Sequence, residues 1–142
     1  MTQKYCLPIR VYVEDTDAGG IVYYANYLKY IERARTELIR TLGFDKPALF
    51  GSLQFVVHSV NIKYIQSAIL DDQIIATAQL KDVSRASFIV TQSVVRGNDF
   101  LVKAEVKVAC IDREKKRPQT IPGDMLKKLK AEIKNEKGGR GE

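Results

Sequence analysis

The sequence predicts an α+β fold in which one long, largely apolar helix lies against a strongly curved antiparallel sheet of about five strands. Two observations predict it. A helical repeat of apolar residues covers 24–42, and four β-rich runs punctuated by turn residues follow it. With 142 residues, the chain can bury enough apolar surface to fold without metal or disulfide staples. We therefore expect a single domain over 1–136 and a flexible basic tail over 137–142.

The first predicted strand covers 9–13, where apolar and polar residues alternate. It ends at 14–20, EDTDAGG, which combines carboxylates with small and turn-forming residues. The helix that follows repeats apolar side chains every three or four positions, and Gly43 stands where a helix C-cap belongs. The repeating positions are Tyr27, Ile31, Ala34, Leu38 and Leu42.

The β-rich runs are about 53–66, 73–82, 86–96 and 100–111. Short turn segments separate them, including the hairpin-type sequence at 97–99, so we expect an antiparallel meander. Alternation in the last two runs leaves one face of the sheet wet or facing a partner, and free sheet edges favour pairing with a second copy. Beyond two prolines, residues 123–135 are expected to form a short amphipathic helix.

The net charge of +6 is unevenly distributed. Residues 113–142 hold 10 basic and 5 acidic side chains, so +5 of the +6 belongs to them. A solvated basic tail is the usual meaning of such a segment, although it can also meet phosphates. The start of the chain lacks the apolar stretch of a signal peptide, and we interpret Cys6 and Cys110 as buried thiols in a reducing compartment. We therefore expect a cytoplasmic protein.

Several chemistries lack their characteristic residues in this sequence. His58 is the one histidine, it falls in a predicted strand, and the cysteines are far apart. No zinc-ligand spacing and no evident Ser-His-Asp or Cys-His pair is therefore present. Neither common glycine-rich nucleotide-phosphate motif occurs. We expect no metal and no cofactor.

Three carboxylates within four residues, Glu14, Asp15 and Asp17, stand directly before two glycines and the predicted helix. The first amides of a helix lack intrahelical acceptors and, with the helix dipole, favour negative charge such as a developing oxyanion. A thiol leaving group, with a pKa of about 8.5, departs as thiolate with little help from a general acid. One carboxylate and one oxyanion site therefore suit thioester hydrolysis better than amide hydrolysis. Taken alone, an aspartate in such a turn is more often a cap or turn former.

The segment 11–27, VYVEDTDAGGIVYYANY, continuing into YIERARTE at 30–37, resembles the signature of the 4-hydroxybenzoyl-CoA thioesterase family of hotdog folds. It is most similar to the Tol-Pal-associated acyl-CoA thioesterase branch of bacteria, and the similarity covers roughly residues 9–130. The resemblance implies a helix wrapped by a curved sheet and dimers that join two sheets, often paired into tetramers. It also implies an active site at the dimer interface.

The resemblance assigns roles to individual residues. Asp17, the last aspartate of the motif, matches the catalytic carboxylate. The backbone amide of Tyr24 matches the donor at the first helical turn that polarises the thioester carbonyl. Its side chain departs from the histidine that is frequent in this branch, which puts substrate preference or a secondary acid-base role in question more than the basic activity. The further substrate-binding positions are Gly20, Val22 and Tyr23 near the motif, and Arg85 and Ser87 for the phosphates of coenzyme A.

We therefore expect an acyl-CoA thioesterase in which Asp17 either attacks the thioester carbonyl or activates water; the sequence leaves both routes open. One alternative within the fold is an acyl-thioester dehydratase or isomerase. Enzymes of that kind typically use a histidine together with a carboxylate on the helix, and the predicted helix here contains no histidine. Another is a non-catalytic module whose basic C-terminal segment binds nucleic acid or an acidic membrane. The expected partners are acyl-CoA and further copies of the chain, without nucleic acid or stable membrane insertion.

Overall fold

The computed structural model describes residues 4–44, 49–50 and 53–140. In chain order the elements are β1 (Tyr5–Arg10), the 3₁₀ helix η1 (Val13–Asp15), α1 (Asn26–Thr41), β2 (Leu49–Phe50), β3 (Leu53–Tyr64), β4 (Gln73–Val83), β5 (Ser87–Arg96), β6 (Asp99–Asp112) and α2 (Gly123–Arg140). The strands form one sheet in the order β1-β4-β5-β6-β3-β2, and neighbouring strands are antiparallel. The predicted α+β class is confirmed.

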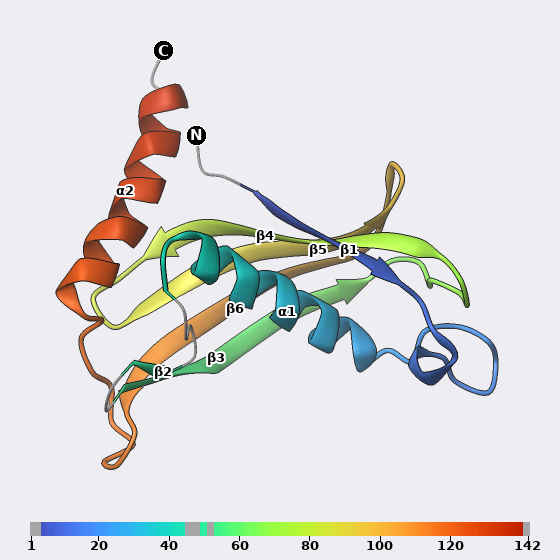
Figure 1. Cartoon of the computed structure of the whole chain (residues 1–142), viewed down its shortest axis with the longest axis horizontal. Coiled ribbons are helices and arrows are strands. Elements are labelled where there is room, and N and C mark those ends of the chain that lie inside the picture. Colours follow the sequence, from blue (N-terminus) through green and yellow to red (C-terminus); the bar gives the residue numbers. More distant parts are fainter. Residues whose placement is uncertain (1–3, 45–48, 51–52, 141–142) are drawn as a thin grey trace.

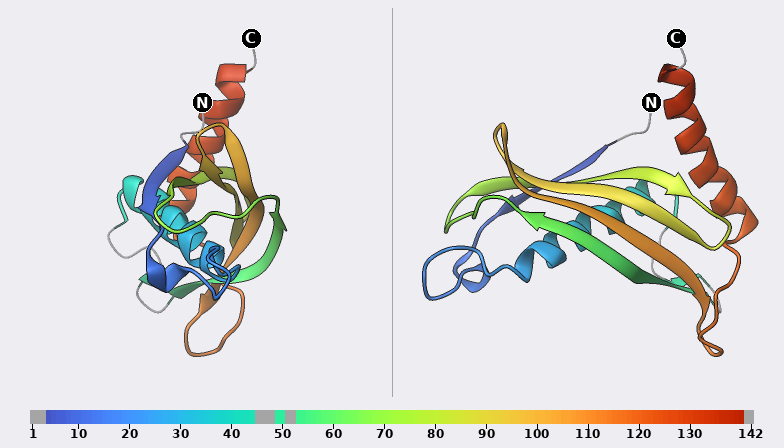
Figure 2. Two further views of the ribbon diagram at one scale, coloured as in Figure 1. Left: turned by 90° about the vertical axis from the view of Figure 1, so that its right-hand side faces the viewer. Right: turned by 180° about the vertical axis from the view of Figure 1, so that it is seen from behind.

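The sheet curls around α1, which lies along its concave face (Figures 1 and 2). Every second residue of a strand faces the helix, so alternate residues of β4 from Ile74 to Leu80 are buried in the core. The core contributed by α1 consists of Tyr27, Tyr30, Ile31, Ala34, Leu38 and Ile39. The helix-facing residues of β4 are Ile74, Ala76, Ala78 and Leu80. This packing fixes the start of α1 against one end of the sheet.

The alternation of apolar and polar residues predicted the first strand at 9–13, but β1 lies earlier in the chain, at Tyr5–Arg10. Pro8 cannot donate a ladder hydrogen bond, but β1 is an edge strand that pairs with β4 alone, so it accommodates the proline. After Arg10 the chain leaves the sheet, where the Val11 N–H donates to the Asp72 carbonyl at 2.9 Å. The 3₁₀ helix η1 then leads into the acidic loop.

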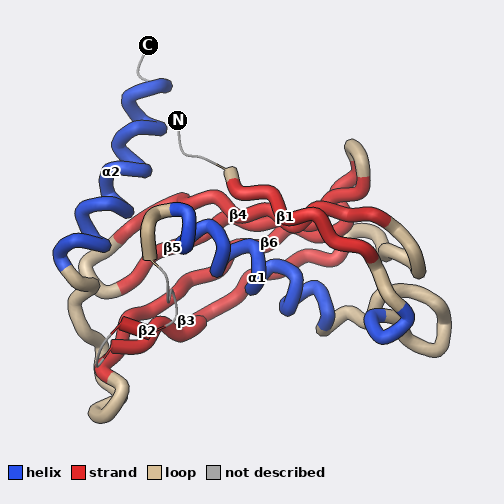
Figure 3. Tube along the Cα trace, in the orientation of Figure 1, coloured by secondary structure: helices blue, strands red, loops and turns tan. Residues whose placement is uncertain are grey.

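The predicted meander holds for β4, β5 and β6 but is wrong for β3. β3 pairs with β6, with Val60 opposite Val106, and so lies across the sheet from β4. Residues 65–72 are therefore a crossover between two parts of the sheet rather than a hairpin turn (Figure 3). Alternation of apolar and polar residues specifies which face of the sheet a residue occupies, but it does not determine which strand pairs with which. The sequence pattern therefore did not predict this connection.

Both helices differ from their predicted bounds at the ends. α1 begins at Asn26 and ends at Thr41, and Gly43 follows with a φ of +100°, the left-handed conformation expected of a glycine beyond a helix end. α2 continues past the predicted 123–135 to Arg140 and takes in part of the predicted flexible tail, although Gly138 and Gly139 within this extension are poor helix formers. Residues 141–142 of that tail lie outside the described residues.

Within the described part of the chain, no helix has the length and apolar character needed to cross a membrane. The cytoplasmic location stays a prediction from the sequence.

Candidate active site

The loop between η1 and α1 carries the predicted catalytic carboxylate in a tight turn. The Asp17 N–H donates to the Ile21 carbonyl at 2.9 Å, and the Gly20 N–H donates to the Asp17 carbonyl at 3.0 Å. Gly20 adopts a φ of +83°, which favours glycine. The Gly19 N–H donates to Oδ1 of Asp17 at 2.8 Å, which fixes the side chain. Oδ2 has no hydrogen-bond partner among the described residues and is free to act.

The turn before α1 carries the main-chain donor. The N–H groups of Asn26, Tyr27 and Leu28 donate to carbonyls three residues earlier, at 2.8, 3.3 and 3.2 Å. No acceptor in the described part of the chain takes a hydrogen bond from the Tyr24 N–H. Because these hydrogen bonds span three residues rather than the four of an α-helix, the regular helix begins only at Asn26. Tyr24 therefore lies two residues before α1 rather than in its first turn. The unpaired N–H stands at the positive end of the helix dipole, where it attracts negative charge.

Asp17 and Tyr24 line the same cavity, which has a volume of about 210 Å³. The Tyr64 ring centroid lies 6.1 Å from that of Tyr24 and 5.8 Å from that of Tyr27, so one wall is aromatic. The other lining residues are Ile21, Val22, Ile65, Gln66 and Ser67. Asp17 and Tyr24, the residue with the unpaired N–H, therefore line one small space that also has an apolar wall, which suits a carbonyl group attached to an apolar chain.

The other predicted substrate-binding residues divide into two groups. Val22 lines the cavity, whereas Gly20 and Tyr23 lie beside it in the chain without lining it. Arg85 and Ser87 lie in the β4–β5 turn and at the start of β5, at the opposite end of the sheet from the acidic loop (Figure 1). The 11 residues of β4 separate the two ends by roughly 35 Å. A single chain therefore does not bring these two residues to Asp17.

Asp15, which the sequence placed among turn formers, connects the acidic loop to α1. Its Oδ2 accepts the Tyr12 N–H and its Oδ1 accepts Nδ2 of Asn26, each at 2.9 Å. Its carbonyl accepts the Tyr23 N–H at 2.9 Å. The Tyr30 hydroxyl is buried in the same region without a hydrogen-bond partner among the described residues, and burial followed by the nearby Asp15 charge raises the pKa of Tyr30. No sequence motif predicts this network, because Asp15 and Asn26 lie eleven residues apart in the chain.

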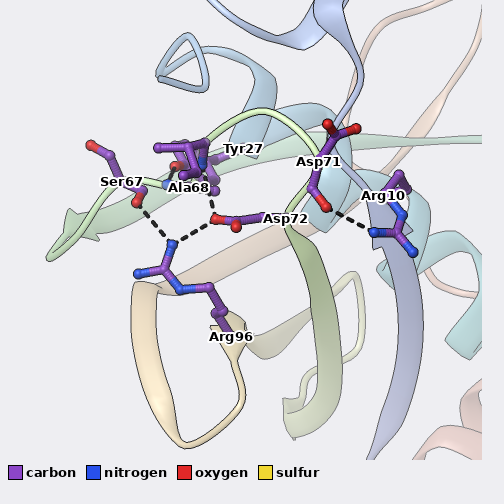
Figure 4. Close-up of polar contacts among 8 residues, drawn as sticks. Arg10, Tyr27, Ser67, Ala68, Asp71, Asp72 and Arg96 are labelled. Carbon is purple, nitrogen blue, oxygen red and sulfur yellow. Dashed lines mark hydrogen bonds and ion pairs between the residues drawn. The ribbon is translucent and has the colours of Figure 1, made fainter. Parts of the chain in front are cut away.

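The wall formed by the crossover segment is held by Arg96. Its Nη1 lies 2.6 Å from Oδ2 of Asp72 and 3.3 Å from the Ser67 carbonyl (Figure 4). The same Asp72 oxygen accepts the Ile69 N–H at 2.9 Å. Partial burial alone would raise the pKa of Asp72, but the Ile69 hydrogen bond and the Arg96 guanidinium hold it below its ordinary value.

Asp72→Asn is expected to destabilise the protein at neutral pH and to matter much less in acid. The folded pKa of Asp72 lies below its unfolded value of about 3.9, so its contribution is present above that value and is lost as pH falls through the folded pKa. The difference in free energy of unfolding from wild type should shrink between about pH 6 and about pH 3 in urea titrations. Asp71→Asn is the control, because that side chain makes no hydrogen bond among the described residues. An undiminished difference for Asp72→Asn in acid would contradict the assignment.

The histidine and the cysteines lie outside the cavity lining. His58 is exposed at a β-bulge of β3 and does not line the Asp17 cavity of its own chain. Both cysteines are free thiols; Cys110 is buried as predicted, whereas Cys6 is exposed on the edge strand β1, contrary to prediction. Among the described residues, no group of three or more His, Cys, Asp or Glu side chains is arranged to hold a metal ion.

Comparison with known proteins identifies the family to which this geometry belongs. Residues 11–129 match the Thioesterase-like superfamily. The chain belongs to that superfamily. It is 43% identical over 123 residues to acyl-CoA thioesterase YbgC of Haemophilus influenzae, an alignment that covers 85% of this chain and 90% of the relative. It is 39% identical over 131 residues to acyl-CoA thioester hydrolase YbgC of Escherichia coli O6:H1, covering 91% and 98% of the two chains.

Solved structures of the superfamily share the fold. The crystal structure of a probable thioesterase from Bartonella henselae matches with a TM-score of 0.74 and 34% identity, covering 84% of this chain and 98% of that chain. The resemblance to hotdog thioesterases predicted from the motif at 11–27 is therefore confirmed.

Proposed function

We propose that this protein hydrolyses acyl-CoA thioesters to a free acid and coenzyme A. The observation that carries the proposal is the cavity lined by both Asp17 and Tyr24, in which the Tyr24 N–H has no partner among the described residues. The similarity to two proteins named as acyl-CoA thioester hydrolases, at 39% and 43% identity, supports the substrate class.

In the proposed reaction the thioester carbonyl enters the cavity with its oxygen toward the Tyr24 N–H. Oδ2 of Asp17 either attacks the carbonyl carbon or takes a proton from an attacking water. Both routes place negative charge on the carbonyl oxygen, which the N–H stabilises. Collapse of the tetrahedral species breaks the C–S bond and expels the thiolate. In the nucleophilic route, water then hydrolyses the mixed anhydride and restores the Asp17 carboxylate.

The test is a panel of acyl-CoA substrates assayed by release of free thiol, with Asp17→Asn as the control. We expect wild type to hydrolyse members of the panel and the variant to lose most of that activity. Failure to hydrolyse any member above the buffer rate would overturn the proposal. Salt-sensitive RNA or lipid binding that disappears on charge reversal at Lys127, Lys128 and Lys130 would instead favour a binding module.

We further infer that the working unit is a dimer joined through the outer edge of β3. β3 pairs with β6 on one side, whereas β2 covers only Leu53 and Gln54 on the other. The remaining outer edge has no strand partner in the described part of the chain, and the strand exposes Val57, Val60 and Tyr64. An exposed apolar edge strand favours pairing with a second copy. Pairing of dimers into tetramers stays a prediction.

Val60→Lys is expected to shift the protein toward monomers at micromolar concentration, because a lysine on an edge strand opposes strand pairing. Size-exclusion chromatography with light scattering measures the mass of the species. Thr91→Lys is the matched control, since Thr91 is exposed on the central strand β5 and should leave the mass unchanged. A wild-type mass of one chain at all concentrations would contradict the dimer.

A second chain is also the proposed source of the contacts to the coenzyme A phosphates. Arg85 lies beside the end of β6, where its carbonyl accepts the Ile121 N–H at 2.8 Å. Four basic side chains follow nearby at 113–117, so this end of the molecule is rich in positive charge. A phosphate-bearing substrate seated at Asp17 would meet Arg85 and Ser87 only across a subunit boundary.

A further inference from the structure

A second cavity lies between α1 and the concave face of the sheet, further along the helix than Asp17. Its volume is about 240 Å³. Most of its wall is apolar, and Phe55 and Phe88 stand with ring centroids 6.0 Å apart. The polar side chains in the lining are Glu32, Arg35 and Thr36 of α1. A guanidinium in a mostly apolar wall is costly to desolvate, so its environment indicates what the cavity can bind.

The Arg35 guanidinium is held in place by a buried amide. Its Nη1 donates to Oε1 of Gln92 at 2.9 Å. Gln92 is 1% exposed and is itself fixed, because its Nε2 donates to the Ile31 carbonyl at 2.7 Å and to the Thr77 carbonyl at 3.1 Å. The orientation of the guanidinium is therefore set by the main chain of α1 and β4.

Arg35 has donors to spare and no carboxylate against it. A guanidinium carries five N–H donors, and one hydrogen bond is made to the protein. In the described part of the chain, no carboxylate lies within 4.0 Å of the guanidinium. The Glu32 charge attracts it from a greater distance. One Glu32 oxygen accepts a hydrogen bond from the Thr36 hydroxyl at 3.3 Å. No nitrogen of Arg35 is both enclosed and unpaired, so its remaining donors are open to the cavity or to solvent.

The two cavities lie along the same strip between α1 and β3. Tyr64 of β3 lines the Asp17 cavity, and Val57 lines the Arg35 cavity. Val60 lies between them on β3 and is exposed in the single chain, so the second chain proposed to pair at this edge would cover the strip. On α1, Tyr27 and Arg35 are eight residues or roughly 12 Å apart, a distance that an extended chain covers in about ten bonds.

We propose that the Arg35 cavity receives the far end of the acyl group and favours acyl groups that end in a carboxylate over those that end in a methyl group. This inference rests on the proposed thioesterase function and adds a substrate class to it. The carboxylate would replace the water around the free guanidinium donors with charge-assisted hydrogen bonds. The apolar strip would bury the methylene chain between the two polar ends.

The test compares pairs of substrates of equal length: decanoyl- with decanedioyl-CoA and dodecanoyl- with dodecanedioyl-CoA. In Arg35→Met, which keeps the unbranched apolar stem of the side chain and removes the guanidinium, the ratio of kcat/KM for the diacid to that for the monoacid should fall about tenfold or more, mainly through KM. Hydrolysis of the monoacid substrates should change much less. Arg35→Lys should retain part of the preference. Arg33→Met, an equal charge change at an exposed position of α1, should leave the ratio at the wild-type value.

The outcomes separate this inference from the function on which it rests. An unchanged ratio in folded Arg35→Met, with monoacid hydrolysis still dependent on Asp17, overturns the inference alone. Absence of hydrolysis for every acyl-CoA overturns the proposed function. Should Arg35→Met fail to fold, inhibition of wild type by the free acids decides: decanedioate should inhibit more strongly than decanoate, and equal or weaker inhibition contradicts the role of Arg35.

Discussion

Asp17→Asn is expected to lower kcat for acyl-CoA hydrolysis by about 10³-fold, because the amide can neither attack the thioester nor accept a proton from water. The substitution should leave the loop intact, since the asparagine oxygen can still accept the Gly19 N–H that now binds Oδ1. Steady-state thiol release measures the loss. Thermal unfolding and coenzyme A binding should stay near their wild-type values.

Glu14→Gln is the matched control for this experiment. Glu14 belongs to the same acidic run, is exposed and does not line the Asp17 cavity. Its neutralisation removes one charge a few residues away and should leave turnover within a small factor of wild type. Full turnover in Asp17→Asn would remove Asp17 from the mechanism.

Label in the Asp17 carboxylate after a single turnover in water labelled with heavy oxygen would favour the nucleophilic route. In the nucleophilic route, water that attacks the anhydride at the aspartyl carbon leaves label in the Asp17 carboxylate. In the general-base route, all of the label appears in the released acid. Mass spectrometry of the peptide that contains Asp17 measures the difference.

The second large effect is expected at the contact between Asp15 and Asn26. Asn26→Asp should lower kcat roughly 10- to 100-fold, because it leaves two carboxylates facing one another where Oδ1 of Asp15 now accepts Nδ2 of Asn26. Asp15→Asn should lower kcat less, because the Asn26 amide can rotate and accept a hydrogen bond from the new amide. Asp15 also holds the Tyr23 N–H through its carbonyl, so a displaced loop moves the adjacent Tyr24 amide. Asp15 is thus expected to act as a positioning residue for the main-chain donor.

The reciprocal double variant, with asparagine at 15 and aspartate at 26, tests the positioning role. It restores one donor and one acceptor across the contact and leaves an amide oxygen for the Tyr12 N–H. Most of the lost kcat should therefore return, with KM changing little, as a double-mutant cycle would show. If the single variants lose stability while the folded fraction keeps wild-type kcat, Asp15 has a structural role only.

Much of the architecture was predictable because it depends on local periodicity. The alternation in 86–96 and 100–111 reproduces β5 and β6 to within a residue or two, and Gly43 stands just past the end of α1. The acidic loop and the start of the long helix were located as well, since carboxylates, glycines and a helical repeat follow one another directly in the chain. Their roles still depend on the experiments above.

The position of β3 and the walls of the site were not predictable in this way. Tyr64 and Ser67 reach the Asp17 cavity because the crossover passes the start of α1, and Arg96 holds that crossover from another strand. The opposite holds for Arg85 and Ser87. The resemblance to the family assigned them to the substrate site, but the fold places them at the end of the sheet far from Asp17. Pairings between distant segments depend on which surfaces pack together, and no spacing along the chain encodes them.

The sequence by itself determined the long apolar helix, the alternating strands and the acidic loop that precedes the helix, because each of these arises from residues close together in the chain. The tertiary structure alone decided that Asp17 and Tyr24 line the same cavity, that Asp15 meets Asn26, and that Gln92 of β5 fixes Arg35 of α1. Each of these contacts depends on the packing of α1 into the curved sheet. That packing is set by burial of the core as a whole rather than by any single motif.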